Sequence, residues 1–182
     1  MLRPAGESDV ENMRGWRNQP VNREVSIHHH EIDEDEHRAW WSAVKDDPSR
    51  QVLVFEAEGR PLGIVNYFDL DLDGPERTGA WGFYLDHETT SAEGTTMTAW
   101  IQVMKEATRY AFDDEDGPRL DVLTGEVLEG NDAVRAMNRR FRFAEEAPEQ
   151  REVDGRTITV YHISLRRENR RQKKAQPKGP PS

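Results

Sequence analysis

Residues 78–96 read Thr-Gly-Ala-Trp-Gly-Phe-Tyr-Leu-Asp-His-Glu-Thr-Thr-Ser-Ala-Glu-Gly-Thr-Thr. The apolar and aromatic first part, 78–86, predicts a strand, and its interior Gly82 indicates a bulge or a close approach of another backbone. The polar residues 87–94 predict a loop. Apolar residues then recur at helical spacing, so a long helix is expected to begin near Thr95. Its expected buried stripe is Met97, Trp100, Ile101, Met104, Thr108 and Ala111.

The residues upstream of this stretch predict a short strand, two helices and a β-hairpin. In chain order these elements are expected at residues 2–4, 8–18, 33–46, 51–57 and 62–70. Each helix opens with a capping-box pattern, Ser8–Glu11 in the first and Asp33–Glu36 in the second. The turn between the last two strands contains Gly59, as is typical of a hairpin.

The residues downstream of the long helix predict a strand, a third amphipathic helix and a closing hairpin. Their expected ranges are 120–128, 131–141, 143–147 and 157–165. Asn131 is suited to cap the helix, whose buried face would be Val134, Met137 and Phe141. The whole order predicts an α+β fold, with a mixed central sheet of about seven strands flanked by about four helices.

Charge divides the 182-residue chain into two parts. Residues 166–182 contain seven Lys or Arg and one acid, Glu168, which leaves 18 basic and 34 acidic residues in 1–165. We expect 1–165 to form one domain and 166–182 to be a basic, Pro-rich disordered tail. Such a tail is either a solvated extension or a contact for RNA or an acidic partner. The acidic domain itself argues against binding nucleic acid or an anionic membrane.

Several protein classes are excluded by composition. The chain has no cysteine, so it has no disulfide framework, no thiolate nucleophile and no cysteine-based zinc site. No apolar run is long enough to cross a bilayer, and the first residues lack the apolar stretch of a signal peptide. A cytoplasmic protein is expected.

With these elements in this order, residues 2–165 resemble the GNAT superfamily of acyl-CoA-dependent N-acyltransferases. The motifs that carry the likeness are Leu2-Arg3-Pro4 with Asp9, Trp16-Arg17-Asn18, His37-Arg38-Ala39-Trp40, the hairpin with Gly63, Ala80-Trp81-Gly82-Phe83-Tyr84-Leu85, and Asn131 with Phe143. The set looks most like the bacterial branch that acetylates nucleotide-linked amino sugars. It is also similar to ribosomal-protein N-terminal acetyltransferases.

The resemblance implies acetyl-CoA as acyl donor, bound where the fourth and fifth strands of the sheet splay apart. It implies that the main chain of Phe83, Tyr84 and Leu85 pairs with the pantetheine amides, while a backbone N–H at the bulge faces the thioester oxyanion. The pyrophosphate is expected at Gly94, Thr95 and Thr96, because a helix N-terminus favours anions. Asn131 and Asn138 are expected on the other side of the donor. The alternative for Phe83 and Tyr84 is plain strand packing.

Two positions depart from the family pattern. In the phosphate loop, Ser91–Thr96, only Gly94 matches, and Glu93 must point away from the phosphates or repel them. Asn138 stands where many relatives have a Tyr that protonates the leaving thiolate, and an amide cannot do this. The acid step is therefore unassigned.

The acceptor side needs a base, either a neutral histidine or a chain of water molecules, because an amine must lose a proton to react. Of His28, His29 and His30 we favour His30; the alternative is a surface cluster, and no metal is expected. His37 is expected to be a packed helix residue. The expected acceptor wall consists of Asn66, Phe68 and Trp81, with Trp16 and Arg17 opposite, and its alternative is core packing plus a surface ion pair.

These observations leave three functions open. The first is an N-acetyltransferase for a primary amine on a small hydroxylated molecule, namely an amino sugar, free or nucleotide-linked. The second is a peptide or protein N-terminal acetyltransferase, and the third is a GNAT-fold binding module without acetyl transfer. The expected partners are the small-molecule amine and a second copy in a homodimer, with no nucleic acid and no membrane.

Overall fold

A central eight-stranded sheet organises this computed structural model, which describes residues 1–170. The strand order is β1-β2-β3-β4-β5-β8-β6, and β7 also pairs with β8. The strands are β1 (Leu2–Pro4), β2 (Gln51–Ala57), β3 (Arg60–Asp71), β4 (Thr78–Leu85), β5 (Val122–Leu128), β6 (Ala144–Glu145), β7 (Glu149–Val153) and β8 (Arg156–Arg166). The helices are α1 (Val10–Asn18), α2 (Pro20–Glu24), α3 (Glu34–Val44), α4 (His87–Ala92), α5 (Thr96–Phe112) and α6 (Asp132–Arg140).

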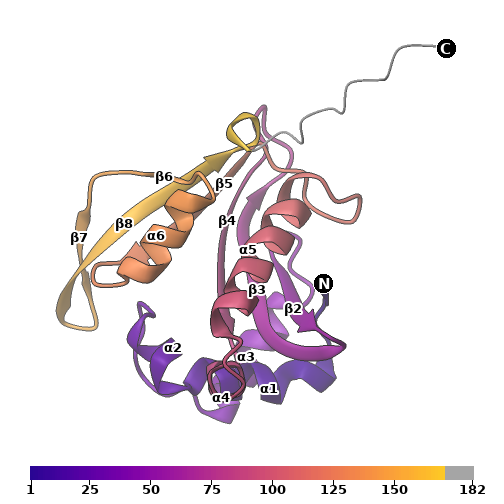
Figure 1. Cartoon of the computed structure of the whole chain (residues 1–182), viewed down its shortest axis with the longest axis vertical. Coiled ribbons are helices and arrows are strands. Elements are labelled where there is room, and N and C mark those ends of the chain that lie inside the picture. Colours follow the sequence, from indigo (N-terminus) through magenta and orange to yellow (C-terminus); the bar gives the residue numbers. More distant parts are fainter. Residues whose placement is uncertain (171–182) are drawn as a thin grey trace.

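This architecture confirms the expected α+β fold with a mixed sheet. Figure 1 shows α5 in front of β3 and β4 and α6 in front of β5 and β8, while α1, α2, α3 and α4 gather at the lower end of the sheet. The counts differ from the expectation, since residues 1–170 hold eight strands and six α-helices. The additional elements are short: α2, α4 and β7 have five, six and five residues.

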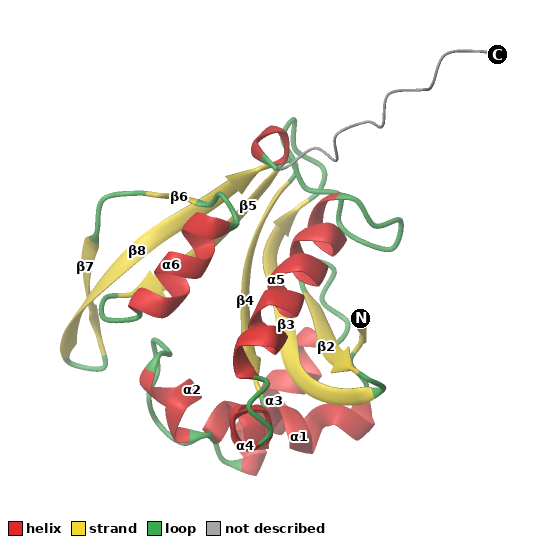
Figure 2. Cartoon of the chain, in the orientation of Figure 1, coloured by secondary structure: helices red, strands yellow, loops and turns green. Residues whose placement is uncertain are grey.

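The sheet splits between β4 and β5, as the family resemblance implied. These two strands are the parallel pair, and they pair only where Thr78, Gly79 and Ala80 face Val122, Leu123 and Thr124. From Trp81 onward the strands diverge, which is visible in the lower half of Figure 2. The antiparallel pair β5–β8 then continues on the far side of the split.

The predicted bulge at Gly82 is wrong. Gly82 pairs in regular register with Asn66, and the irregularity in the β3–β4 ladder lies between Phe68 and Asp71. A Cβ added to Gly82 would meet no atom within 4 Å. The glycine therefore leaves open space beside the strand instead of bending it.

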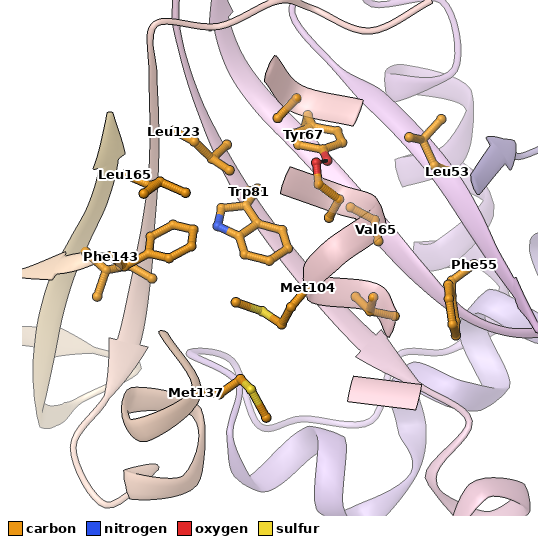
Figure 3. Packing of buried hydrophobic residues seen from close by; sticks show 14 of the residues in the cluster. Leu53, Phe55, Val65, Tyr67, Trp81, Met104, Leu123, Met137, Phe143 and Leu165 are labelled. Atoms are coloured by element: carbon orange, nitrogen blue, oxygen red, sulfur yellow. Dashed lines mark hydrogen bonds between the residues drawn. The ribbon is translucent and has the colours of Figure 1, made fainter. Parts of the chain in front are cut away.

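A large apolar core joins α5 to the sheet. Trp81 lies at its centre, stacked on Phe83 and Phe143 with ring centroids 5.6 and 5.9 Å apart, and Met104 and Met137 lie nearby (Figure 3). The predicted stripe of α5 is correct only in its second half, at Met104, Thr108 and Ala111. Met97 is 60% exposed and Trp100 is half-buried, because the first two turns of α5 bury Ala99 and Val103 against the core instead.

The capping interactions predicted for the first turns of the two N-terminal helices were partly correct. Asp33 caps α3, since its side chain accepts from the Glu36 amide at 2.8 Å. The capping box predicted at Ser8–Glu11 does not form, because Asp9 instead accepts from the Gly6 amide and from the guanidinium of Arg3.

The C-terminal boundary differs from the expected one. Arg166 ends β8, and the next residues fold against the domain, with Arg167 donating to the Phe112 carbonyl at 2.7 Å and Arg170 bonded to Asp113 at 2.7 Å. The folded part thus includes residues 166–170, which were expected to belong to the tail. The rest of that tail lies outside the described residues.

Candidate active site

A cavity of about 460 Å³ occupies the split between β4 and β5. The strands supply Trp81 to Leu85 on one side and Gly125 to Val127 on the other, and helices α5 and α6 complete the walls. We call this cavity the wedge. Its lining residues on the helices and the N-terminal segment are Val21, Asn22, Val25, His87, Thr96, Met97, Trp100, Asn131, Ala133, Val134 and Asn138.

One wall of the wedge is a strand edge. Phe83, Tyr84 and Leu85 line it, as expected, and within residues 1–170 the β4 main chain beyond Ala80 has no strand partner on the side of β5. Such an edge offers backbone donors and acceptors to an extended ligand. The wall is thus chemically suited to pair with a chain that carries amide groups.

The mouth of the wedge lies at the N-terminus of α5. Gly94 adopts a φ of +66°, which favours glycine, and Thr95 is the N-cap of the helix. Thr96 lines the wedge directly. The first turn of α5 has no acidic residue, so its free N–H groups and the helix dipole favour an anion here.

Glu93 does not add unpaired negative charge to this mouth. Its two carboxylate oxygens accept from the guanidinium of Arg60 at 2.8 and 2.9 Å. This hydrogen bonding lowers the pKa of Glu93 and keeps it ionised beside its cation. The pairing with Arg60 therefore satisfies the requirement that Glu93 must not repel the phosphates expected at this loop.

The opposite wall of the wedge is formed by α6. Asn131 caps this helix by accepting from the Val134 amide at 3.4 Å and also lines the wedge. Asn138 is 3% exposed and lines the wedge two turns further along the same face of α6. Both residues thus line the wedge, and neither amide can donate an ionisable proton.

A second, smaller cavity of about 240 Å³ lies against the β3–β4 hairpin. Tyr84 lines both cavities, and Asn66 of the small cavity pairs in register with Gly82 of the wedge. The two cavities therefore adjoin through the residues of β4. The small cavity is lined by Arg17, Ile32, Glu36, His37, Trp40, Asn66 and Tyr84.

Unpaired polar atoms gather around the small cavity. Within the described residues, five buried side-chain nitrogen or oxygen atoms have no hydrogen-bond partner, and three of them belong to its lining residues. These are Nη1 of Arg17, Nε2 of His37 and Oδ1 of Asn66. Buried polar groups are normally paired, so this concentration indicates a place for a polar ligand.

Burial shifts the pKa of three side chains that line the small cavity. Desolvation lowers the pKa of His37 and of Arg17, and it raises the pKa of Tyr84 well above the ordinary phenol value. His37 is therefore neutral at pH 7, whereas Tyr84 keeps its proton. A neutral imidazole has one nitrogen that carries a lone pair, and Nε2 of His37 is buried without a hydrogen-bond partner.

The predicted acceptor residues do not form one wall. Trp16 is 8% exposed in the core between α1 and α3, and Phe68 lies under Arg50 and lines neither cavity. Trp81 lines the wedge but belongs to the core packed on α5, whereas Asn66 lines the small cavity. The expected wall of Asn66, Phe68 and Trp81 is thus divided among three environments.

The expected base, His30, is a surface residue. Its side chain is 53% exposed and its Nε2 lies 2.8 Å from Glu36, and it lines neither cavity. His37, which the sequence assigned to plain packing, is the histidine that lines the small cavity. The His37–Trp40 pair, stacked at 5.1 Å, was the sequence signal for this wall.

A third cavity, also about 460 Å³, lies between the later turns of α5 and the end of α6. Lys105, Arg140, Arg142 and Arg170 line it, no residue of β4 or β5 does so, and Leu165 of β8 is the one strand residue in its lining. No group of three or more His, Cys, Asp or Glu side chains within residues 1–170 is arranged to hold a metal ion. In the same residues, no helix has the length and apolar character to span a membrane.

A sheet split between two parallel strands, with a cavity in the split and a helix N-terminus at its mouth, is the arrangement implied by the acyltransferase resemblance. The chain matches the acetyltransferase (GNAT) domain over residues 5–150. It therefore belongs to this family and is an acetyltransferase. No curated protein sequence matches the chain significantly.

Solved structures share the fold at low sequence identity. The spermidine N-acetyltransferase from Vibrio cholerae, in complex with CoA and spermine, matches with a TM-score of 0.75 and 16% identity over 93% of this chain and 96% of that one. A ribosomal-protein-alanine N-acetyltransferase from Brucella melitensis matches at 0.64 and 19%, over 91% and 99%. An N-acetyltransferase from Staphylococcus aureus Mu50 matches at 0.62 and 17%, over 91% and 97%.

Proposed function

We propose that this protein transfers an acetyl group from acetyl-CoA, bound in the wedge, to the primary amine of a small polar acceptor in the small cavity. The observation that carries the proposal is the unpaired edge of β4, which lines the wedge from Trp81 to Leu85. The thioester supplies an activated acyl carbon. The amine nitrogen forms the new bond to that carbon, the C–S bond breaks, and the electron pair leaves on sulfur.

The lining of the wedge fits the donor in shape and charge. Gly82 and Gly125 face the wedge from its two strands, and neither presents a side chain to an extended ligand. A Cβ on Gly125 would meet the Trp81 carbonyl at 3.3 Å, so β5 already lies close to β4 at this point. The first turn of α5, beside the Arg60–Glu93 pair, suits the pyrophosphate.

Proton handling is assigned to two residues of the small cavity. His37 is neutral at pH 7 and has a free lone pair on Nε2, so it suits the base that takes the proton of the amine. Tyr84 remains protonated and lines both cavities, so it can donate a hydrogen bond at their junction. Its raised pKa makes it a poor proton donor, and the thiolate is therefore expected to leave unprotonated.

Amino sugars, free or nucleotide-linked, remain one proposed acceptor class, because the motifs resemble that branch of the family. The polar atoms of Arg17, His37 and Asn66 are suited to hydroxyl and charged groups. Peptide N-termini are the alternative class. They would have to place a terminal residue in the same 240 Å³ cavity.

The test combines binding and turnover. Calorimetric titration of acetyl-CoA should give saturable binding, and release of CoA thiol can be followed with a thiol reagent without background, because the protein has no cysteine. Amino sugars, UDP-linked amino sugars and N-terminal peptides are compared as acceptors. Binding without turnover on any amine would favour the binding module, and absence of binding would reject the placement of the donor.

A further inference from the structure

We propose that the acceptor is a compact zwitterion, whose anionic group, a carboxylate or a phosphate, binds Arg17 while its amine faces His37 and Asn66. This inference rests on the proposed function and specifies its acceptor. It comes from the side chains around the small cavity, where one unpaired cationic donor and two unpaired neutral acceptors meet.

Arg17 is held as an anion receptor. Its Nη2 donates to the His28 carbonyl at 2.7 Å, which fixes the guanidinium, while Nη1 is buried and has no partner. No carboxylate lies within salt-bridge distance of Arg17 among the described residues, although most arginines of this acidic protein pair with one. A desolvated guanidinium with a free N–H binds an oxyanion strongly, in a planar geometry.

Two other side chains that line the small cavity present hydrogen-bond acceptors. His37 presents the lone pair of Nε2, and Asn66 presents Oδ1. Glu36 also lines the cavity, and its carboxylate is engaged by His30 at 2.8 Å. An amine has N–H donors for these atoms, and it is expected to bind against them while the anionic group binds Arg17.

The size and charge of the small cavity disfavour purely cationic acceptors and require that the part of the acceptor inside it is compact. The cavity of about 240 Å³ holds a compact molecule. A second ammonium placed against Arg17 would meet like charge in a partly desolvated site, which is unfavourable. An extended polyamine is therefore expected to be a poor acceptor.

The proposal is tested with amines that share a two-carbon frame. β-Alanine carries a carboxylate, phosphoethanolamine a phosphate, ethanolamine a neutral hydroxyl, and ethylenediamine a second amine. We expect kcat/KM for the better of the two anionic amines to exceed that for ethanolamine and ethylenediamine by about tenfold or more. The order of β-alanine and phosphoethanolamine identifies the anion, and glucosamine 6-phosphate compared with glucosamine applies the same test to amino sugars.

Two matched variants separate a receptor from a structural arginine. Arg17→Gln removes the free guanidinium, and Arg23→Gln is the control, because Arg23 also donates to a loop carbonyl, that of His29 at 2.9 Å, but lines neither cavity. Arg17→Gln should raise KM for the anionic amine about tenfold to a hundredfold, with kcat, KM for ethanolamine and the Kd of acetyl-CoA nearly unchanged. Arg23→Gln should change none of these, and Arg17→Lys should restore part of the loss.

Equal preference for neutral and anionic amines, or an equal loss on both in Arg17→Gln, overturns the zwitterion proposal while leaving acetyl transfer intact. If no amine is acetylated, the proposed function fails instead. In that case the melting-temperature rise caused by phosphoethanolamine and β-alanine, compared with ethanolamine, still tests the anion receptor in the wild type and in Arg17→Gln.

Discussion

The guanidinium of Arg60, at the start of β3, holds the carboxylate of Glu93, at the end of α4, through two hydrogen bonds of 2.8 and 2.9 Å. The pair joins the β2–β3 turn to the loop that precedes α5. It explains how an acid is tolerated beside the expected phosphate site, because the charge of Glu93 is compensated before any ligand arrives.

Replacing Arg60 of this pair should weaken binding of the acetyl donor. In Arg60→Gln, Glu93 becomes an uncompensated anion near the pyrophosphate, and we expect the Kd of CoA to rise about threefold to tenfold at low salt, with a smaller change at high salt. Calorimetric titration at two salt concentrations measures both effects.

The double variant supplies the control for that prediction. Arg60→Gln combined with Glu93→Gln should bind CoA almost as the wild type does, because the unpaired charge is gone. Arg38→Gln breaks another exposed pair, with Glu34 on α3 at 2.9 Å, and should leave the Kd unchanged. If Arg60→Gln also leaves the Kd unchanged, the pyrophosphate does not bind near this loop.

Filling the wedge at Gly82 should block the donor. Gly82 has open space around an added Cβ, so Gly82→Leu is expected to fold normally and to occupy the wedge. We expect CoA affinity to fall by about tenfold or more, since overpacking a closely fitted site costs about 1–3 kcal/mol. Gly94 is less suitable for this test, because its φ of +66° would strain any side chain.

The control for the filled wedge is Gly15→Leu. Gly15 lies on the exposed side of α1, where an added Cβ also meets no atom within 4 Å. Circular dichroism should give closely similar melting temperatures for both variants, and only Gly82→Leu should lose CoA binding. Full affinity in Gly82→Leu would mean that the donor does not pass along this strand.

A buried ion pair near the N-terminus should matter for stability and not for binding. Asp9 is 4% exposed and accepts two hydrogen bonds of 2.8 Å from Arg3, which also bonds Glu56 at 2.8 Å. Asp9→Asn leaves Arg3 short of one partner, so the free energy of unfolding should fall by about 1–3 kcal/mol, measured in urea. The exposed pair Glu11–Arg14 is the comparison, and Glu11→Gln should change stability little.

The architecture was predictable because its signals are local. Asp33 capping α3, the apolar alternation of β2 and the glycine turn of the β2–β3 hairpin each lie within a few residues of the element that they define. The short elements α2 and α4 were missed because five or six residues contain too little periodicity to show a helix. The dipeptide Gln19-Pro20 and the cap by Asp86 are their only local signals.

The wedge followed from the family resemblance, but the small cavity did not follow from the sequence. Its walls come from α1, α3, β3 and β4, and the pairing of Asn66 with Gly82 depends on an irregularity between Phe68 and Asp71 that sequence does not reveal. A one-residue difference in register reverses the faces of a strand, so Asn66 and Trp81 were grouped on one wall incorrectly. Which histidine faces the cavity depends on the same tertiary packing.

The titration of His37 gives the last prediction. Burial lowers its pKa in the folded protein below the value of about 6.5 that it has when unfolded. Below about pH 6.5 the unfolded chain therefore binds more protons at this site, and the folded state loses stability as the pH falls. His37→Gln removes this contribution, so its melting temperature should fall less than that of the wild type between pH 8 and pH 5.

Measurements of kcat should distinguish the role of His37 from that of His30. His37→Gln should lower kcat by about 10²-fold or more with the Kd of acetyl-CoA unchanged, because a general base contributes at least that much. His30→Gln, which alters only the exposed contact with Glu36, should keep both its kcat and the acid sensitivity of its stability. The opposite pattern, with kcat lost in His30→Gln and kept in His37→Gln, would return the base to the surface loop and show that the loop closes over the acceptor during turnover.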